Sequence, residues 1–355
     1  MNMNKKKVGV VLVNYKDYAS TYLIACRDSL LLQDYGCDNF QVYIVDNASS
    51  PSSLKIIKEI YPEAVIIPRV DGNYCKANNV GFKKAISDGC GYLVTVNMDT
   101  EMDKGWLSQL VLALDSNEEA GVAQSKILLF EKNKDDLRIN TLGNNIHFLG
   151  FGSTSCYKEK DRHISAYPEI KGYASGCSFI TRKKVFNEVG GWNEDYYMYH
   201  DDIEFSLKTR LAGYKVILAP NSVIFHKYEF SRSTRMLYFM ERNRYLLIYS
   251  FYPCYLIILL IPAILFMNLG MMFFAAVKGW FKIWLKVNLY FLKPNTWWKV
   301  FKFRRKIKKL KKGSIIEISK QMKGKLEFLE IDNFILRKIA NPLLNCYFQF
   351  IKKII

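Results

Sequence analysis

Short apolar runs alternate with helix-like segments along the first hundred residues, and this alternation restricts the fold more than any other feature of the sequence. Four of the runs are continuous enough to form buried strands: 8–14, 42–45, 64–67 and 92–96. The segments between them carry helical spacing or helix-start residues: 20–33, 52–60 and 76–88. Repeated strand–helix units predict a mostly parallel sheet with helices on both faces, which is an α/β fold.

The strand expected at 92–96 ends in a polar triplet, Asn97-Met98-Asp99. Ligands of open α/β sheets bind beyond the carboxyl ends of the strands, so Asp99 is expected where a divalent cation and a diphosphate could be held. Taken alone, the triplet fits an ordinary strand-to-helix turn at least as well. A dinucleotide-binding domain is not expected, because the first turn, 14–17, lacks the Gly-x-Gly-x-x-Gly pattern that brings backbone against a pyrophosphate.

A second group of acidic residues stands at the start of a predicted helix. Asp201 and Glu204 have the spacing of a capping box, which would satisfy backbone N–H groups of the first turn. Asp202 is not needed for that cap, and it fits either a solvated acid or a general base. His226 follows a short apolar run and could join the carboxylate of the triplet on one divalent ion, although a lone histidine is more often structural.

The region between these motifs is less regular. Residues 126–172 are richer in charge, Asn and Gly, and we expect them to form an irregular excursion. Small residues around Ser175-Gly176 would allow the close approach of a substrate, or would form a tight strand with a bulge.

The charge is divided unequally along the chain. Residues 1–230 contain 27 Lys and Arg and 28 Asp and Glu, whereas residues 231–355 contain 24 basic and five acidic residues. This asymmetry indicates a nearly neutral globular unit followed by a segment that meets an anionic surface. The eight cysteines are dispersed without a Cys-x-x-Cys pair, and 8–13 is too short for a signal-peptide core. We therefore expect the N-terminal part in the reducing cytoplasm.

The C-terminal third begins with 24 uncharged residues, 254–277, which are enough to cross a bilayer. The following stretch, 278–313, is rich in Trp and contains 13 Lys and Arg and no acid, a composition typical of helices in an anionic membrane interface. Because the positive-inside bias opposes a single crossing, we expect a re-entrant or in-plane segment that bends at Pro262. A buried helix followed by a solvated tail is the simpler alternative. A nucleic-acid-binding tail would have no use for the apolar run.

These motifs, in this order, resemble family 2 of the inverting glycosyltransferases, and in particular its rhamnosyltransferase-like branch, over roughly residues 8–250. The matching segments are Val10–Tyr15, Val45–Ser49, Lys76–Gly81, Asn97–Asp99, Ser175-Gly176, Gly190–Glu194, Asp201-Asp202, His226 and Arg242–Arg244. Each segment alone is weak, and their common order is the specific signal.

The resemblance implies a GT-A catalytic domain at 1–250 and inverting transfer of a sugar from a nucleoside-diphosphate donor with Mg²⁺ or Mn²⁺ on the diphosphate. The composition of 251–355 predicts a membrane-associating helical region after that domain. The residues that it implies at the donor nucleotide are Asn14, Asp46, Asn79 and Asn97. Those implied at the metal are Asp99 and His226. Those implied on the acceptor side are Ser175, Gly176 and Trp192. The implied general base is Asp202, with Asp201 as the alternative.

Departures from the family pattern leave two of these roles open. The triplet begins with Asn97 where the family has Asp, so Asp99 is expected to be the one carboxylate on the metal. His200-Asp201 replaces the commoner Gly-Glu before the base, which leaves the base between Asp201 and Asp202, and Asn193 stands where the family usually has Asp.

We therefore expect an enzyme that glycosylates a lipid-linked or cell-surface polysaccharide acceptor at the cytoplasmic face of the inner or plasma membrane, attached peripherally or monotopically. Rhamnose is the first candidate for the transferred sugar, followed by the sugars of UDP donors. A metal-dependent nucleotidyltransferase is the alternative, because it shares the sheet and the metal chemistry, but it would release pyrophosphate instead of a nucleoside diphosphate. Binding of nucleic acid is not expected.

Overall fold

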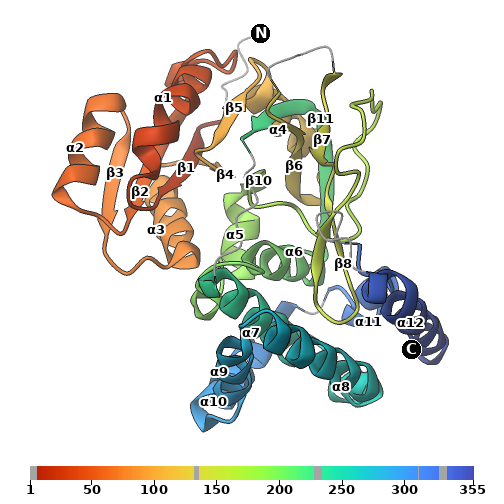
Figure 1. The fold of residues 1–355 in the computed structure, drawn as a ribbon. Helices are drawn as coiled ribbons and strands as arrows, with labels where there is room; N and C mark the ends of the chain where they lie inside the picture. Colours follow the sequence, from red (N-terminus) through yellow and green to blue (C-terminus); the bar gives the residue numbers. More distant parts are fainter. Residues whose placement is uncertain (1–5, 132–135, 228–233, 311, 328–333) are drawn as a thin grey trace. The chain divides into compact units, whose positions relative to one another are not determined.

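The computed structural model describes residues 6–131, 136–227, 234–310, 312–327 and 334–355. The chain divides into two compact units (Figure 1). The first unit comprises 1–144, 154–210 and 214–229, and the second comprises 145–153, 211–213 and 230–355. The second compact unit thus begins before residue 251, because the helix at 234–251 packs with the C-terminal helices. The functional division at 250 stays a prediction.

The first unit is built on one nine-stranded sheet in the order β3-β2-β1-β4-β10-β6-β11-β5, with β7 (Ile139–Thr141) paired to β6. The N-terminal half of the sheet is parallel and consists of β1 (Val8–Asn14), β2 (Phe40–Asn47), β3 (Val65–Arg69) and β4 (Tyr92–Val96). These four strands lie where the apolar runs predicted them, and the α/β fold class is confirmed.

The other half of the sheet mixes directions. β10 (Ser178–Arg182) is antiparallel to both β4 and β6 (Ala120–Leu129). β11 (Lys215–His226) is parallel to β6 and antiparallel to β5 (Thr100–Met102). The irregular excursion expected from 126 onward is wrong for 126–129, because this segment continues β6 and buries its apolar side chains beside β11. Beyond it lie only short strands among the described residues, including β8 (Asn144–Ile146) and β9 (Gly152–Thr154).

Helices cover both faces of this sheet. They are α1 (Tyr18–Leu31), α2 (Pro51–Ile60), α3 (Tyr74–Ser87), α4 (Trp106–Asp115), α5 (Lys183–Val189) and α6 (Asp201–Leu211). The alternation of side chains along β1 explains the two layers. Val8, Val10 and Leu12 belong to the core that α1 and α4 cover, whereas Val11 points to α3 on the opposite face.

Two glycines let α3 approach β1 closely. A Cβ on Gly81 of α3 would lie 2.6 Å from Val11 Cγ1, and a Cβ on Gly9 of β1 would overlap the Cβ of Ala85. α3 itself begins where Asn73 caps it, since the Asn73 side chain accepts a hydrogen bond from the Lys76 N–H at 3.0 Å. The backbones of α3 and β1 are therefore so close that a side chain at either glycine would clash with the other element.

The second unit is helical. Its α-helices are α7 (Thr234–Phe251), α8 (Cys254–Val277), α9 (Phe281–Phe291), α10 (Pro294–Ile307), α11 (Ile315–Lys320) and α12 (Asn341–Ile354). α8 continues through Pro262 as one helix, so the chain does not reverse direction there as a re-entrant segment would. The chain turns instead at 278–280, where Gly279 adopts a φ of 73°, and α9 then packs along α8.

The Arg242-Asn243-Arg244 motif has a structural use within the second unit. The guanidinium of the fully buried Arg244 lies between the rings of Phe151 (4.3 Å) and Tyr245 (4.2 Å). It also pairs with Glu241 at 2.8 Å and donates a hydrogen bond to the Leu149 carbonyl at 3.1 Å. Arg244 thereby ties the loop 145–153 to α7.

The close approach of α3 and β1 predicts that Gly9→Ala lowers the free energy of unfolding by about 1–3 kcal/mol, because the added methyl overlaps Ala85. Urea unfolding followed by circular dichroism measures this change. Gly91→Ala is the matched control, since a Cβ on Gly91 meets nothing within 4 Å and should leave stability within about 0.5 kcal/mol. Equal stability of the two variants would contradict the packing account.

Candidate active site

Asn14 and Asp46 end neighbouring parallel strands and stand opposite each other in the register of β1 and β2. Both are fully buried. Asn14 Nδ2 donates to Asp46 Oδ1 at 2.7 Å, and Ser53 Oγ at the start of α2 donates to Asp46 Oδ2 at 2.6 Å. Asn14 Oδ1 accepts from the Ala19 N–H of α1 at 2.8 Å. The Asp46 carboxylate, which is expected at the donor nucleotide, is therefore held in one orientation by Asn14 at the end of β1 and Ser53 at the start of α2.

Asn47 and Arg69 form a neighbouring pair that sequence reasoning missed. They stand opposite each other where β2 and β3 end. Asn47 Oδ1 and Arg69 Nε are buried and have no hydrogen-bond partner among the described residues, while the Arg69 guanidinium pairs with Asp71 at 2.5 Å. The next residue, Ala48, has a φ of 109°, a strained conformation of the kind found at binding sites. The only available signal was the position of both residues at the same strand ends as Asp46.

Asp99 and His226 are brought together by the sheet. Thr100 on β5 pairs with His226 on β11, so that Asp99 Oδ2 lies 3.4 Å from His226 Nε2. Asp99 Oδ2 also accepts a hydrogen bond from the Tyr18 hydroxyl at 2.5 Å. Asp99 Oδ1 is buried and has no partner among the described residues. An unpaired buried carboxylate oxygen is costly, and a bound cation is one way to satisfy it.

The electrostatics of this pair favour the charged forms. Burial by itself would raise the pKa of Asp99, but the hydrogen bond and charge of His226, with the Tyr18 hydroxyl, hold this pKa below its ordinary value. Burial would likewise lower the pKa of His226, yet Cys177 and Asp99 raise it to about 10. A cation that binds the same carboxylate and the imidazole must therefore displace the proton of His226.

The donor set around Asp99 fits a hard divalent cation shared with a ligand. Within the part of the chain that the structure describes, no group of three or more His, Cys, Asp or Glu side chains converges on one point. The protein thus offers one carboxylate and one imidazole, and phosphate oxygens and water would complete the coordination of Mg²⁺ or Mn²⁺. Asn97 lies nearby, with its Oδ1 accepting from the Tyr74 hydroxyl at 3.4 Å.

Asp201 and Asp202 open α6, and residues 176–177, which precede β10, connect them to the Asp99 region. The Asn97 N–H donates to the Cys177 carbonyl at 2.9 Å, and the adjacent Gly176 lies against Asp202. Burial raises the pKa of Asp202 to about 6, although backbone N–H groups of Ile203 and Gly176 oppose the shift. Burial and the charge of Asp202 raise the pKa of Asp201 to about 8. The charge of one carboxylate opposes ionisation of the other, so the two carboxylates ionise in succession.

The capping box expected for Asp201 and Glu204 is wrong. Asp201 is the first helical residue, and the Glu204 carboxylate is fully buried, where it pairs with Lys208 at 2.7 Å. Glu204 also accepts a hydrogen bond from the Asn193 N–H at 3.3 Å. A buried lysine requires a counter-charge more than the helix start requires a cap, so Glu204 serves Lys208.

The segment before α6 is strained. Tyr197, Tyr199 and His200 adopt φ values of 67°, 64° and 59°, which are uncommon for residues other than glycine. The Tyr197 carbonyl accepts hydrogen bonds from the N–H groups of Tyr74 (2.8 Å) and Cys75 (3.2 Å) at the start of α3. These contacts hold the strained turn that delivers Asp201 and Asp202. Nothing in the residue types predicts this conformation, and sequence reasoning missed it.

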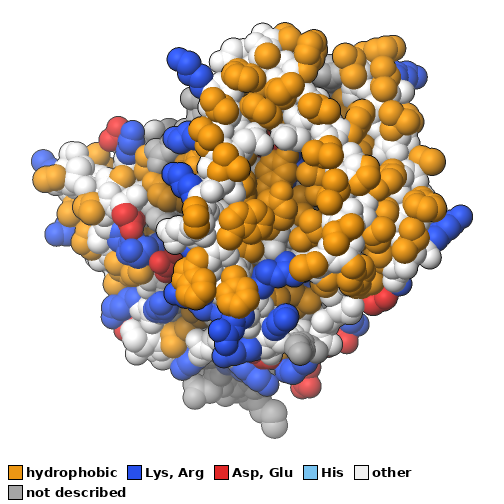
Figure 2. Space-filling view, turned by 90° about the horizontal axis from the view of Figure 1, so that it is seen from below, with side chains coloured by type: hydrophobic (Ala, Val, Ile, Leu, Met, Phe, Trp, Pro, Cys, Tyr) orange, Lys and Arg blue, Asp and Glu red, His pale blue; other side chains and the backbone are white. Residues whose placement is uncertain are grey.

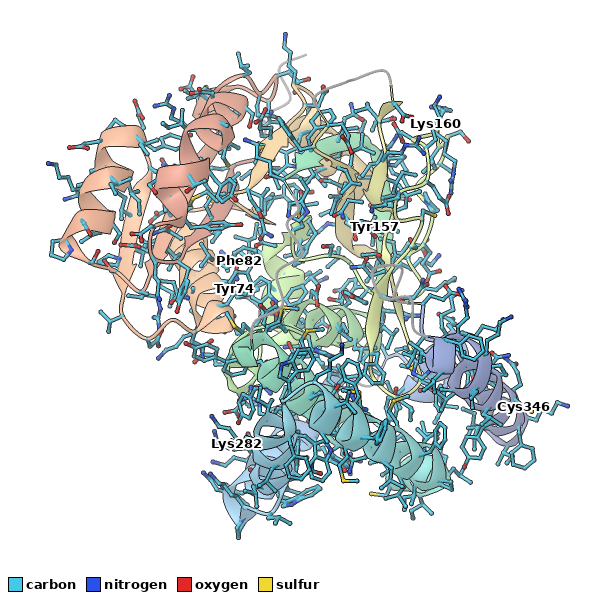
Figure 3. The ribbon with its side chains drawn as sticks, in the orientation of Figure 1. Tyr74, Phe82, Tyr157, Lys160, Lys282 and Cys346 are labelled. Atoms are coloured by element: carbon cyan, nitrogen blue, oxygen red, sulfur yellow. The ribbon has the colours of Figure 1, made fainter. Side chains whose placement is uncertain are left out.

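Asn79, Trp192 and Ser175 make packing and loop contacts in the structure, and their expected roles at the site stay predictions. The Asn79 side chain donates to the Trp192 carbonyl (2.9 Å) and accepts from the Trp192 N–H (2.8 Å). The Trp192 ring is 4% exposed and packs between Phe82 and Phe205 at 5.0 and 4.8 Å. Phe82 extends from α3 (Figure 3), and its ring also meets Phe186 of α5 at 5.2 Å. The Ser175 N–H donates to Gln124 Oε1 at 2.7 Å.

Comparison with known proteins identifies the family. The family model described as "Glycosyl transferase family 2" matches residues 9–190, slightly more than half of the chain. The N-acetylglucosaminyl-diphospho-decaprenol L-rhamnosyltransferase of Mycobacterium tuberculosis is 29% identical over 73 residues, 21% of this chain and 23% of that protein. The O-antigen biosynthesis protein RfbC of Myxococcus xanthus is 25% identical over 233 residues, 62% of this chain and 17% of that protein. The chain thus matches less than a quarter of the length of either relative.

Two solved structures share the fold. GalNAc-T7, crystallised with UDP, GalNAc and Mn²⁺, has a TM-score of 0.58 at 15% identity, over 72% of this chain and 49% of that one. The mannosyltransferase PcManGT from Pyrobaculum calidifontis, in complex with GDP-Man and Mn²⁺, has a TM-score of 0.50 at 16% identity, over 87% and 86% of the two chains. The order of strands in the sheet and the polar residues at the strand ends are consistent with the family match. The chain belongs to glycosyltransferase family 2 and has the GT-A fold.

Proposed function

We propose that the protein transfers a sugar, with inversion, from a nucleoside-diphosphate donor to a lipid-linked glycan or cell-surface polysaccharide. The observation that carries this proposal is the unpartnered, buried Asp99 Oδ1 beside His226, connected through Cys177 and Gly176 to Asp202. Family membership favours sugar transfer over nucleotidyl transfer. The name of the mycobacterial relative supports rhamnose as the sugar and a diphospho-lipid as the acceptor.

The donor would lie along the carboxyl ends of β1, β2 and β4. Asp46, held by Asn14 and Ser53, offers a fixed acceptor for an N–H of the nucleotide base. Asp99 and His226 would hold Mg²⁺ or Mn²⁺, and two fold neighbours contain Mn²⁺. This ion would supply positive charge to stabilise the departing nucleoside diphosphate.

Asp202 is the proposed general base. As the acceptor oxygen forms its bond to the anomeric carbon, its proton passes to the Asp202 carboxylate, and the bond from that carbon to the diphosphate breaks on the opposite face. One displacement of this kind inverts the anomeric carbon. Asp202 suits the role better than Asp201, because Asp202 lies against Gly176, next to the Cys177 carbonyl that accepts the Asn97 N–H of the metal-binding triplet.

This assignment predicts that kcat/KM rises with pH through a limb near pH 6. A carboxylate accepts a proton only in its ionised form, and burial raises the pKa of Asp202 to about 6. Activity should therefore be lost below about pH 6 and retained above it. Steady-state rates of nucleoside-diphosphate release between pH 4.5 and 8.5 measure the limb.

Two isosteric variants separate the candidates. Asp202→Asn should lower the rate by about 10²–10⁴-fold while the nucleotide still binds in the presence of metal, and Asp201→Asn should retain the acid limb. Near-normal turnover of Asp202→Asn would contradict the assignment of Asp202 as the general base. Loss of the limb in Asp201→Asn alone would assign the base to Asp201.

We further propose that the second unit attaches the enzyme to the cytoplasmic face of an anionic membrane. Figure 2 shows extensive hydrophobic side chains bordered by Lys and Arg. On α8, large exposed residues recur at helical spacing, namely Ile258, Ile261, Leu265, Leu269 and Phe273. α9 and α10 add Phe281, Leu285, Leu289, Trp297, Trp298 and Phe301. We call these eleven residues the apolar platform. Exposed apolar side chains with Lys and Arg around them fit an interfacial surface.

The packing within the second unit favours attachment in the plane of the membrane. By length and composition, α8 is a helix that could span a bilayer, and it is the only one of the described helices that could. Its opposite side is buried, with Leu256, Leu260 and Met267 facing the unit. Trp284 Nε1 donates to Asn268 Oδ1 at 2.9 Å, which fixes α9 beside the second half of α8.

That contact places charge beside the apolar helix. Lys282 and Lys286 lie on α9, two residues to either side of Trp284, and Lys286 Nζ lies 4.6 Å from the centre of the Tyr238 ring on α7. Because α9 is fixed beside α8, a crossing by α8 would still carry both ammonium groups toward the hydrocarbon. Each lysine at the bilayer centre costs about 2.5–3.5 kcal/mol. With α8 in the interface, the platform contacts acyl chains while the lysines reach the lipid headgroups. This supports a peripheral or monotopic attachment.

The platform predicts that Leu265→Glu/Phe273→Glu weakens binding to liposomes of anionic lipid by at least about tenfold, because each substitution replaces an apolar contact with a charge. Flotation of the full chain with vesicles of phosphatidylglycerol and phosphatidylcholine measures the binding. Leu112→Glu, which changes a 46% exposed leucine on α4 of the first unit, is the matched control. Unchanged flotation of the double variant would contradict the proposal.

A further inference from the structure

We infer that Tyr18 is a positioning residue for the metal ligand Asp99: its hydroxyl holds the carboxylate so that Oδ1 is the oxygen presented to the cation. This inference rests on the proposed metal site. It names a residue outside the metal-binding triplet and outside the motifs of the family resemblance, on a different element, α1.

The two oxygens of Asp99 are in different environments. Oδ2 accepts the Tyr18 hydroxyl at 2.5 Å and faces His226 Nε2 at 3.4 Å. Oδ1 is buried and unpartnered among the described residues. A carboxylate has a soft terminal torsion, and the Tyr18 hydroxyl on Oδ2 restricts its rotation and leaves Oδ1 for a ligand.

This restriction matters more here because the triplet has only one carboxylate. Asn97 occupies the position of the first acid and is engaged by the Tyr74 hydroxyl and by the Cys177 carbonyl. If the Asp99 carboxylate rotates, the triplet has no second carboxylate that would still bind the cation. Partners that orient a metal-binding side chain typically contribute 10–100-fold to metal affinity.

The position of Tyr18 is itself determined by the donor side of the site. Tyr18 is the first residue of α1, and the N–H of the next residue, Ala19, donates to Asn14 Oδ1 at 2.8 Å. Asn14 in turn orients Asp46. The Tyr18 ring also packs on Tyr22 with centroids 4.6 Å apart. The start of α1 thus orients both Asp46, the carboxylate proposed to contact the nucleotide, and Asp99, the carboxylate proposed to bind the metal.

The test is Tyr18→Phe in the full chain, which retains the ring and removes the hydroxyl. Binding of Mn²⁺ is measured by electron paramagnetic resonance in the presence of UDP or GDP, and binding of the same nucleotide is measured in EDTA. We expect the Kd for Mn²⁺ to rise 10–100-fold and the affinity for nucleotide in EDTA to stay unchanged. If Tyr18 had only a structural role, the substitution would lower the affinity for Mn²⁺ and the affinity for nucleotide in EDTA together. Excess Mn²⁺ would then not return nucleotide binding to the wild-type level.

Tyr43→Phe is the matched control, because Tyr43 also donates to a carboxylate, Asp88, at 2.9 Å, but away from Asp99. It should leave the Kd for Mn²⁺ at the wild-type value. Wild-type binding by Tyr18→Phe would overturn this inference and leave the proposed metal site in place. Absence of Mn²⁺ binding by the unmodified protein with either nucleotide would overturn the metal site, and the role of Tyr18 with it.

Discussion

The pairing of β11 with β5 is the constraint on which the rest of the site depends. It sets His226 opposite Thr100 and thereby places an imidazole beside the Asp99 carboxylate. The two residues come from distant parts of the chain, and only the antiparallel register brings them together. Tyr18 then engages Asp99 Oδ2, which leaves Oδ1 buried and unpartnered. A polar atom in that state is tolerated where a ligand completes it.

The first half of the fold could be predicted because local pattern and burial agree there. Val8–Asn14 and Tyr92–Val96 are continuous apolar runs, and both are central parallel strands. β6 was not predicted, and its last residues, 126–129, were expected in an irregular excursion because the stretch that begins at Lys126 is rich in charged residues. In the structure Lys126 pairs with Asp161 at 3.0 Å, a contact that sequence spacing does not reveal.

The candidate site shows the same division between local and tertiary information. Asp99 and Asp202 could be singled out from the residues because Asp99 follows a predicted strand and Asp202 begins a predicted helix, whereas Asp46 was named only through the family resemblance. Glu204 was taken as part of a cap, because the buried Lys208 that claims it is a tertiary feature. The strained turn at Tyr197 depends on hydrogen bonds from the start of α3 and has no sequence signature.

The C-terminal unit extends this lesson to surfaces. Composition indicated an apolar segment and a basic stretch, but it could not tell which side of α8 faces its own unit. The structure separates a buried row that contains Leu260 from an exposed row that contains Leu265. Pro262 was expected to bend the segment, whereas the chain turns at Gly279 and brings α9 back along α8. A basic helix therefore lies beside the apolar one, which supports attachment in the plane of the membrane.

The central claim is that one displacement, assisted by Asp202 and by the cation-binding Asp99 and His226, transfers the sugar. The most direct measurement follows a transfer reaction by ¹H and ³¹P NMR with a panel of nucleoside-diphosphate sugars, including the rhamnose donor, and reads the anomeric configuration of the product. The account predicts a configuration opposite to that of the donor, with release of a nucleoside diphosphate. A product that retains the donor configuration, or release of pyrophosphate, would contradict it.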